Sequence, residues 1–579
     1  MSLKHCPLTV AAEQNYIESI DAEIALAMKQ LEDLKKRRNA AEALLYSNTA
    51  PSEWQVQEVW RAIEQKEAEL HSVQTQILDL ERTVGNYEDL SEHQQEMKKL
   101  IAQRDEAQSL LEAQRAILSP IRRVPIEILS EIFLHTLHNR YSNEINPYPS
   151  PNNSPMLLSN ICLSWRKLAL DLPLLWSTLH ITIDNTVCRP NPQLIPLWLQ
   201  RSGSLPLSIT FVDRRSPSEP PQLTQVEDLA QAHSSEGITA VSIFEQLAPS
   251  YARWHSLSLE YTEWRRPTGL SFITKDSSPL NLQTLTVSRD FWLSEDVDSL
   301  TALMAAPQLT SLDWKCRHSR LDPIQVLPLA QMVNLDLNHR FDLNSLLDLF
   351  IACPSLVSGN FYVIHLPEGL IPQLERQTRI PVLDHLRELK LSMDWDVARL
   401  MGALKVPSLT SFMLRKNNDI FTLGEHPIGR FWDQTAFIGM LQRSACRLTV
   451  LDLADVDVSP QELVALLQMQ NSSLEHLVLA GEHLQSQPVD DEVLKALTPG
   501  RDGCLCPKLE YIKMWGCVGS TDGLLADMVE SRWMHPDDDI AVTRLKMALF
   551  IFNSAEQPTD WKRLQHVNEA RPGITLIKQ

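Results

Sequence analysis

Four side chains near the C-terminus have the chemistry of metal ligands. Cys504 and Cys506 are separated by one residue, and Cys517 and His535 follow them. Structural zinc sites use cysteine and histidine, but they usually place at least two residues between paired cysteines. This shorter spacing favours ordinary packing, as does the position of Cys517 just after a segment that reads as a strand. We therefore predict that no residue of the chain binds a metal.

Sequence motifs of common enzymes are also missing. The chain contains neither of the glycine-rich phosphate-binding motifs, GxGxxG and GxxxxGK[ST], and neither HExxH nor GxSxG. The acidic run 537–539 is more typical of a solvated turn than of a shaped cation loop. We expect no catalytic residue and no cofactor. An enzyme whose active site is assembled within the C-terminal half stays an alternative, and converging histidine, cysteine and carboxylate side chains would be its mark.

Composition narrows the class of partner. The chain has 579 residues, enough for several domains, and a formal net charge of −20. Such a charge disfavours wrapping of nucleic acid, which needs clustered cations. The only basic cluster, 35–38, fits a solvated helix face better than a nuclear-import signal. No apolar run approaches the roughly 20 residues that span a bilayer, so we expect no membrane partner.

Cysteine usage and the start of the chain indicate the compartment. Nine cysteines, an odd number, are scattered along the sequence, which is typical of reduced thiols. The first residues show no basic segment followed by an apolar one, so a secretory signal is not expected. We therefore predict a cytoplasmic or nuclear protein.

Residues 13–118 have the pattern of long helices. Between Pro7 and Pro120 the only proline is Pro51 and the only glycine is Gly85. Apolar residues recur at alternating spacings of three and four, first at Ile17, Ile20, Ile24, Ala27, Leu31 and Leu34. After a break the rhythm restarts at ten positions, of which only Lys66 is polar: Val56, Val59, Ile63, Lys66, Leu70, Val73, Ile77, Leu80, Val84 and Tyr87. This 3.5-residue repeat predicts a coiled coil, formed either within the chain or by self-association with another chain.

Residues 251–579 show a different repeat, of the form Leu-x-x-Leu-x-Leu. The alternating residues predict a short strand with one buried face, and helix-like segments separate the strands. Ten copies, two of them weak, begin at Trp254, Leu282, Leu309, Met332, Leu356, Leu386, Leu409, Leu448, Leu474 and Leu509. The pattern predicts an irregular leucine-rich-repeat-like solenoid, with an ordinary α/β domain as the alternative. Residues 185–250 read as a linking region with a flexible loop at 213–237.

Between these regions, residues 122–137 (RRVPIEILSEIFLHTL) predict a helix with more apolar surface than a short helix needs. Pro125 suits the first helical position, and the helix is expected to run to about 138. At 100° per residue its apolar side chains cover roughly two thirds of the circumference. They are Ile126, Ile128, Leu129, Ile132, Phe133, Leu134 and Leu137. A domain of this size cannot bury so wide an arc, so part of it is expected to contact a partner.

A second helix is expected over residues 155–171, after a Ser154-Pro155 start signal. It is followed by a strand with alternating Leu179, Ile181 and Ile183.

Taken together, VPIEILSEIFLHTL and LLSNICLSWRKLALDLPLLWSTLHI resemble an F-box of the form found in many basidiomycete fungal proteins. The resemblance covers residues 120–184, here called the F-box-like segment. The chain departs from the family pattern in having Val124 where the family has leucine. The preceding heptads and the following leucine repeats are similar to the usual arrangement in the same group.

This resemblance implies a multidomain protein with an N-terminal α-helical coiled coil, a small all-α F-box and a C-terminal α/β leucine-rich-repeat-like solenoid. It also implies a non-catalytic substrate receptor of an SCF-type ubiquitin ligase, acting in ubiquitin-dependent protein degradation. The F-box would bind a Skp-type adaptor and through it a cullin, while the solenoid would bind an unknown target protein. Positions that match the family's docking pattern are Pro125, Ile126, Ile128, Leu129, Ile132, Phe133, Ile161, Cys162, Trp165 and Leu168.

Two alternatives stay open at this point. Each matching residue contacts the adaptor, packs inside the segment or, as we expect of several, does both, because helix arithmetic does not separate the two roles. The protein as a whole is either a ligase receptor or a scaffold that uses its coiled coil and solenoid to assemble another complex.

Overall fold

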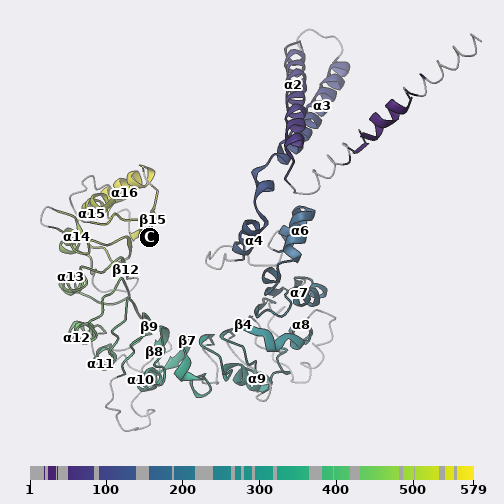
Figure 1. Ribbon diagram of the computed structural model, residues 1–579. Helices are drawn as coiled ribbons and strands as arrows, with labels where there is room; N and C mark the ends of the chain where they lie inside the picture. The colour runs from purple at the N-terminus through teal and green to yellow at the C-terminus, as the bar shows by residue number, and fades with distance from the viewer. Residues whose placement is uncertain are drawn as a thin grey trace, which may run out of the picture. The chain divides into compact units, whose positions relative to one another are not determined.

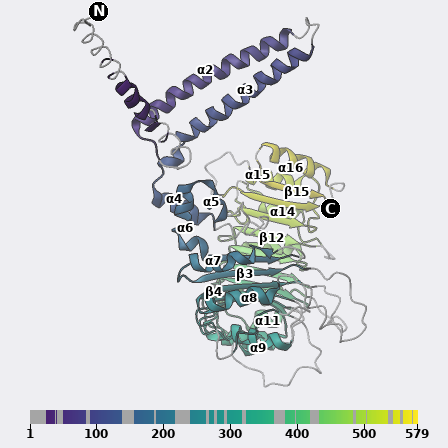
Figure 2. The same ribbon diagram turned by 90° about the vertical axis from the view of Figure 1, so that its right-hand side faces the viewer.

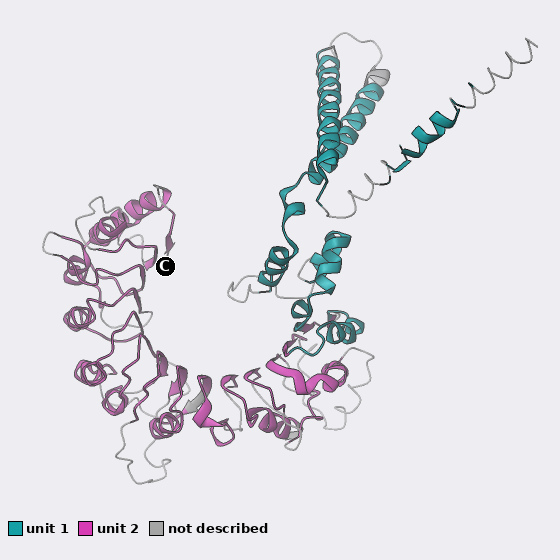
Figure 3. Cartoon of the chain, in the orientation of Figure 1, with its two compact units in different colours: residues 1–180, 189–205 teal, residues 181–188, 206–579 magenta. Residues whose placement is uncertain are grey.

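A computed structural model forms the basis of the structural description. It describes residues 50–83, 90–137, 155–184, 188–215, 239–262, 268–274, 279–289, 294–316, 323–363, 381–394, 397–417, 431–481, 487–500, 503–533, 542–552, 557–570 and 572–578, with Ser19, Ala22, 24–33, Lys35, Lys36 and Asn39. The chain forms two compact units (Figure 3), residues 1–180 with 189–205 and residues 181–188 with 206–579. They are called unit 1 and unit 2.

Unit 1 contains two long helices that form a hairpin. Helix α2 (Glu53–Thr83) and helix α3 (Leu90–Ile117) lie side by side (Figures 1 and 2). Ile77 packs in one cluster with Leu100, whereas Glu67 pairs with Arg115 at 2.6 Å, so the two helices run antiparallel. The heptad positions of α2 from Val56 to Leu80 are buried or half-buried, and the residues between them are mostly exposed. The second heptad run therefore packs within the chain.

The first heptad run is helical where it is described. Ile24, Ala27 and Leu31 are exposed in the helix, and Ile17, Ile20 and Leu34 lie outside the described residues, as do Val84 and Tyr87 of the second run. Whether this first helix associates with another chain stays a prediction.

The rest of unit 1 consists mainly of short helices. They are η2 (Pro120–Arg123), α4 (Ile126–His135), α5 (Met156–Ile161), α6 (Leu163–Leu170), η3 (Pro173–Trp176), η4 (Pro192–Leu194) and α7 (Ile195–Arg201).

Unit 2 is built on one sheet. Fifteen strands are assigned among the described residues, in the order β15-β14-β13-β12-β11-β10-β9-β8-β7-β6-β5-β4-β3-β1-β2. The strands are β1 (Thr178–Ile183), β2 (Cys188–Arg189), β3 (Leu207–Asp213), β4 (Trp254–Tyr261), β5 (Thr284–Ser288), β6 (Ser311–Lys315), β7 (Asn334–Phe341), β8 (Ser358–Val363), β9 (Glu388–Met393), β10 (Ser411–Lys416), β11 (Val450–Ala454), β12 (His476–Ala480), β13 (Tyr511–Trp515), β14 (Met547–Phe552) and β15 (Ile574–Lys578). Neighbours from β3 to β15 are all parallel.

Helices connect the strands and cover one side of the sheet. They are α8 (Ala240–Leu247), η7 (Ala248–Arg253), α9 (Ser294–Met304), η9 (Pro323–Gln325), η10 (Leu329–Gln331), α10 (Leu343–Ala352), α11 (Ala398–Ala403), α12 (Gln434–Ser444), α13 (Pro460–Met469), α14 (Asp491–Leu497), α15 (Leu524–Trp533) and α16 (Pro558–Ala570). Within unit 2, α10 to α16 lie on the outer side of an arc of strands (Figure 3). This arrangement confirms the α/β solenoid-like character of the C-terminal region.

The repeat leucines form rows through the core of unit 2, because the parallel strands pair in register. All ten predicted copies coincide with strands β4 to β13. The first row consists of Leu257, Leu285, Leu312, Leu335, Gly359, Leu389, Phe412, Leu451, Leu477 and Ile512. Gly359 interrupts the row for a steric reason, since a Cβ there would lie 2.4 Å from the ring of Phe361. The Phe361 ring packs against the ring of Phe350, with ring centroids 5.3 Å apart, and fills the space that a leucine at position 359 would occupy.

The sheet extends beyond the predicted boundary at residue 251. Strand β3 and helix α8 both lie in the stretch that the sequence predicts to be a linking region. β3 pairs with β4 as an ordinary parallel strand, and its side chains at Leu207, Ile209 and Phe211 are buried. The prediction of a linking region is therefore wrong for this part of the chain. The alternating apolar residues of LSITFVD form a strand with one buried face.

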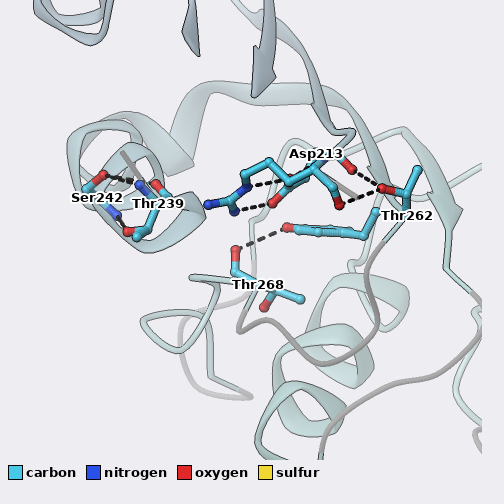
Figure 4. A network of polar contacts seen from close by, with 7 residues as sticks. Asp213, Thr239, Ser242, Thr262 and Thr268 are labelled. Carbon is cyan, nitrogen blue, oxygen red and sulfur yellow. Dashed lines mark hydrogen bonds and ion pairs between the residues drawn. The ribbon is translucent and has the colours of Figure 1, made fainter. Parts of the chain in front are cut away.

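The first residues of the predicted flexible loop are fixed by polar contacts; the rest of it, 216–237, lies outside the described residues. Arg215 Nε donates to the buried Asp213 carboxylate at 2.8 Å, and their side chains form an ion pair. The Thr262 hydroxyl donates to the Asp213 carbonyl at 2.9 Å (Figure 4). The backbone N–H of Thr262 donates to the same carbonyl at 3.0 Å. Each of these groups has a partner within unit 2, so the network stabilises the fold and is not a binding site.

Burial controls the reactivity of the cysteines. It raises the pKa of the Cys188 and Cys446 thiols to about 11 and that of Cys353, Cys506 and Cys517 to about 12. Thiolate is the nucleophile, so these five thiols are expected to stay unmodified by iodoacetamide at pH 8 in the folded chain and to react after unfolding. Peptide mapping by mass spectrometry measures this. Alkylation of Cys517 as fast as that of the half-exposed Cys162 would contradict the described burial.

Candidate docking site

Helix α4 begins at Ile126, one residue later than predicted, because Pro125 is its N-cap (φ −54°, ψ 147°) and not its first helical residue. The Leu129 N–H donates to the Pro125 carbonyl at 2.9 Å, which closes the first turn. The helix ends at His135, earlier than the expected 138, because the Thr136 N–H and hydroxyl both donate to the Phe133 carbonyl (3.1 and 2.6 Å). These bonds tighten the last turn and stop the helix.

The second helix is divided, which corrects the prediction of one helix over residues 155–171. Cys162 is extended (φ −157°, ψ 171°) and separates α5 from α6. Its Sγ accepts a hydrogen bond from the Trp165 N–H at 3.4 Å, so it caps α6. Arg166 Nε donates to the Ser159 carbonyl at 2.7 Å and satisfies an acceptor near the end of α5. Ser154, the expected cap, lies outside the described residues.

Aromatic side chains hold the F-box-like segment together. Phe133 of α4 is fully buried and meets Trp165 of α6 edge to face, with ring centroids 4.9 Å apart. Trp176 of η3 is also buried, and its Nε1 donates to the Ala169 carbonyl at 2.8 Å. The other buried apolar residues of α4, α5, α6 and η3 are Leu129, Leu158, Leu168, Ala169 and Leu175. The buried face of α4 therefore consists of Leu129 and Phe133, which lie one turn apart.

Three isoleucines of α4 lie on either side of this buried face and remain exposed. The exposed fraction is 59% for Ile126, 53% for Ile128 and 44% for Ile132. At 100° per residue, Ile128 and Ile132 lie on one flank and Ile126 on the other. The apolar excess of the helix is thus real, and it consists of these three side chains.

The ten residues that match the family's docking pattern fall into three groups. Those exposed are Pro125, Ile126, Ile128, Ile132 and Ile161; those half-buried are Cys162 and Trp165; those buried are Leu129, Phe133 and Leu168. The buried residues support the surface from inside, and the exposed residues are available to a partner.

Sequence reasoning missed four exposed leucines of the same segment. They are Leu157, Leu163, Leu170 and Leu174. A signal was present for two of them: Leu163 and Leu170 are seven residues apart, on the side of α6 away from the buried Leu168 and Ala169. The apolar arc of α4 is wider than a short helix needs and therefore indicates a binding surface. The leucines of α6 are not unusual in number and give no such indication.

The metal candidates of the sequence have other partners. Cys506 Sγ donates to the Leu467 carbonyl (3.8 Å), Cys517 Sγ donates to the Leu479 carbonyl (3.4 Å), and Cys504 Sγ accepts from Arg532 (3.4 Å). His535 and residues 537–539 lie outside the described residues. In the part of the chain that the structure describes, three potential ligands nowhere gather into a metal-binding group. Nor does any described helix combine the length and the apolar character needed to cross a membrane.

Comparison with known proteins adds no relative. Neither the family models nor the curated proteins contain a match to this chain. The F-box resemblance therefore rests on the quoted residues alone.

Proposed function

We propose that the chain is a substrate receptor of an SCF-type ubiquitin ligase, in which the F-box-like segment binds a Skp-type adaptor. The exposed isoleucines of α4 are the observation that carries the proposal. They stand at positions that match the docking pattern, while the buried matching positions hold the segment together. An exposed apolar group of this kind on a short segment is a common mark of a protein-binding site.

The energetics of this surface favour a stable contact. Burying one aliphatic side chain fully contributes about 1.5 to 3 kcal/mol. Three isoleucines from α4 with Ile161 therefore supply several kcal/mol, enough to offset part of the cost of association. The adaptor would in turn connect the chain to a cullin.

The proposed mechanism is tethering. The adaptor would hold one end of the chain and a target protein would bind the solenoid-like unit 2, so the target's lysines would be concentrated near a ubiquitin-loaded enzyme. The chain would carry out no bond chemistry itself. A cytoplasmic or nuclear location belongs to the same proposal.

Paired substitution of two exposed isoleucines tests the adaptor contact. Ile128→Asp/Ile132→Asp is expected to weaken capture of purified Skp-type adaptor by at least about a hundredfold, because two charges would be buried without partners. Both positions are exposed, so the thermal unfolding midpoint should change little. Pull-down and biosensor titration measure the binding, and circular dichroism measures the fold.

A matched control separates this effect from any loss of apolar surface. Leu78→Asp/Leu110→Asp makes the same chemical change at similarly exposed positions of α2 and α3 and should keep adaptor binding. Full adaptor binding by the folded isoleucine variant would refute the docking assignment. Adaptor capture without cullin, with unchanged turnover of every cellular protein on deletion, would favour the scaffold alternative instead.

A further inference from the structure

The outward face of the unit 2 sheet, opposite the helices, changes character along the unit. On β4 to β8 its side chains are mostly small and polar or acidic. Ser258, Thr286, Asp313, Asp336 and Asn360 form one cross-strand row. Asp336 accepts hydrogen bonds from Asn360 (3.1 Å), and Asp313 forms an ion pair with Lys315 (2.9 Å). Both carboxylates of this row therefore have partners within the sheet.

On β10 to β14 the outward face is apolar and aromatic. One row across the strands consists of Val450, His476, Tyr511 and Met547. His476 stacks on Tyr511 with ring centroids 5.4 Å apart and an interplanar angle of 24°. Another row consists of Ala454, Ala480, Trp515 and Ile551. Such a face normally packs against something, yet Met547 is 51% exposed and the helices occupy the other side.

Cations stand within this apolar half. Arg415 lies on β10, the strand next to that of Asp452 (β11), and Lys513 lies on β13, in the same cross-strand row as Asp452. Lys390 lies in that row on β9, and all three cations interact electrostatically with the Asp452 carboxylate. Lys390 also pairs with Glu388 at 2.9 Å, whereas Arg415 is exposed and Lys513 lies 5.9 Å from the ring centre of Trp515. Arg415 and Lys513 thus leave a local positive charge on a chain whose net charge is −20.

We propose that the outward face of β10–β14 binds an extended polypeptide segment that combines carboxylates with aliphatic or aromatic side chains. The apolar rows would accept the hydrophobic side chains, and Arg415 and Lys513 would pair with the carboxylates. The acidic half of the face, around Asp313 and Asp336, would repel the same segment. This inference rests on the proposed function, because it names the chemistry of the target that unit 2 would recruit.

Strand geometry sets the length of the segment. Five strands spaced by about 4.8 Å span roughly 19 Å, which an extended chain crosses in about six residues. The small net positive charge of the face, with Asp452 in its middle, suits a short acidic peptide better than a polyphosphate backbone.

Peptide selection on the intact chain tests the proposal. Random nonapeptides displayed on phage are expected to be enriched in sequences that combine Asp or Glu with Leu, Ile, Phe or Trp. A selected peptide, labelled with fluorescein, should bind the Arg415→Glu/Lys513→Glu variant at least about tenfold more weakly in an anisotropy titration. Lys495→Glu/Lys562→Glu makes the same charge change at exposed sites on α14 and α16 and should leave binding unchanged.

Several results would overturn the proposal. These are selection of basic peptides or of none, equal binding by the two variants, competition for the face by a single-stranded oligonucleotide, and a dimer that Arg415→Glu/Lys513→Glu abolishes. Adaptor capture, measured on the same samples, distinguishes the two claims. Peptide binding without adaptor binding would refute the proposed ligase role alone, and adaptor binding with failed selection would refute only this inference.

Discussion

Replacement of Arg532 by methionine is expected to destabilise the C-terminal repeats by about 3 to 6 kcal/mol. Arg532 is fully buried at the end of α15. Its guanidinium donates to three backbone carbonyls: Nε to Leu497 (2.7 Å), Nη2 to Leu505 (2.6 Å) and Nη1 to Cys506 (3.1 Å). Methionine fills much of the space but leaves all three acceptors buried without a donor, at a cost of about 1 to 2 kcal/mol each.

The position of these carbonyls explains why the cost is local. Leu497 ends α14, whose C-terminus carries the negative end of the helix dipole, and residues 505 and 506 lie just before β13. Arg532 therefore joins two successive repeats. In a solenoid the stability depends on such nearest-neighbour contacts, so the loss should appear in β13 and β14 before it reaches distant strands.

Hydrogen exchange of the β13 and β14 amides measures the effect, with protection expected to fall roughly 10²- to 10⁴-fold. Arg563→Met is the control. Arg563 makes ion pairs with Glu530 (2.6 Å) and Asp527 (2.8 Å), which hold its pKa above the usual range. Among the described residues it donates to only one backbone carbonyl, that of Gly523 (3.2 Å), and its side chain is partly exposed. Its loss should cost only about 1 kcal/mol. A larger effect for Arg563 than for Arg532 would show that ion pairs, not buried carbonyls, decide stability here.

The strands of unit 2 were predictable because the alternation of buried and outward residues is local. All ten predicted copies are strands, including the degenerate copy at Leu356. β14 was not predicted because Leu545-x-x-Ala548-x-Phe550 has alanine where the repeat has leucine, although Ala548 pairs in register with Ile512. β3 was not predicted because it directly precedes the loop 213–237. The Ser, Pro and charged residues of that loop led to the prediction that all of 185–250 is a linking region.

Contacts between distant residues were not predictable in the same way. The partner of the α2 seam is α3, whose inward positions include Arg104, Ala107 and Gln114 at heptad spacing. Polar and small residues weakened the apolar signal there, and only the folded hairpin identifies them as seam positions. The break at Cys162 is similar, because an extended residue whose thiol caps the following helix leaves no sequence signature within a continuous apolar stripe.

The candidate docking site was half predictable. The width of the apolar arc on α4 indicated surplus surface, but the sequence did not assign individual residues to either face. That assignment depends on where Trp165 packs, which is a tertiary contact. Neighbouring residues Ile132 and Phe133 therefore look equivalent in sequence and have opposite environments in the fold.

Alanine substitution of these two neighbours is expected to give opposite results. Phe133→Ala removes a fully buried ring and its edge-to-face contact with Trp165, and should destabilise the F-box-like segment by about 3 to 5 kcal/mol. Ile132→Ala, at an exposed position, should change stability by only about 0.5 kcal/mol. Hydrogen exchange of the α4 and α6 amides in the full chain measures both.

Adaptor affinity completes this comparison. Ile132→Ala should weaken adaptor binding by roughly tenfold without loss of amide protection, because it removes contact surface only. Phe133→Ala should weaken binding through unfolding, so a Phe133→Leu variant, which keeps most of the buried volume, should recover both protection and binding. Equal loss of protection in Ile132→Ala and Phe133→Ala would mean that both side chains face the interior. The outward surface of α4 would then be too small to hold an adaptor.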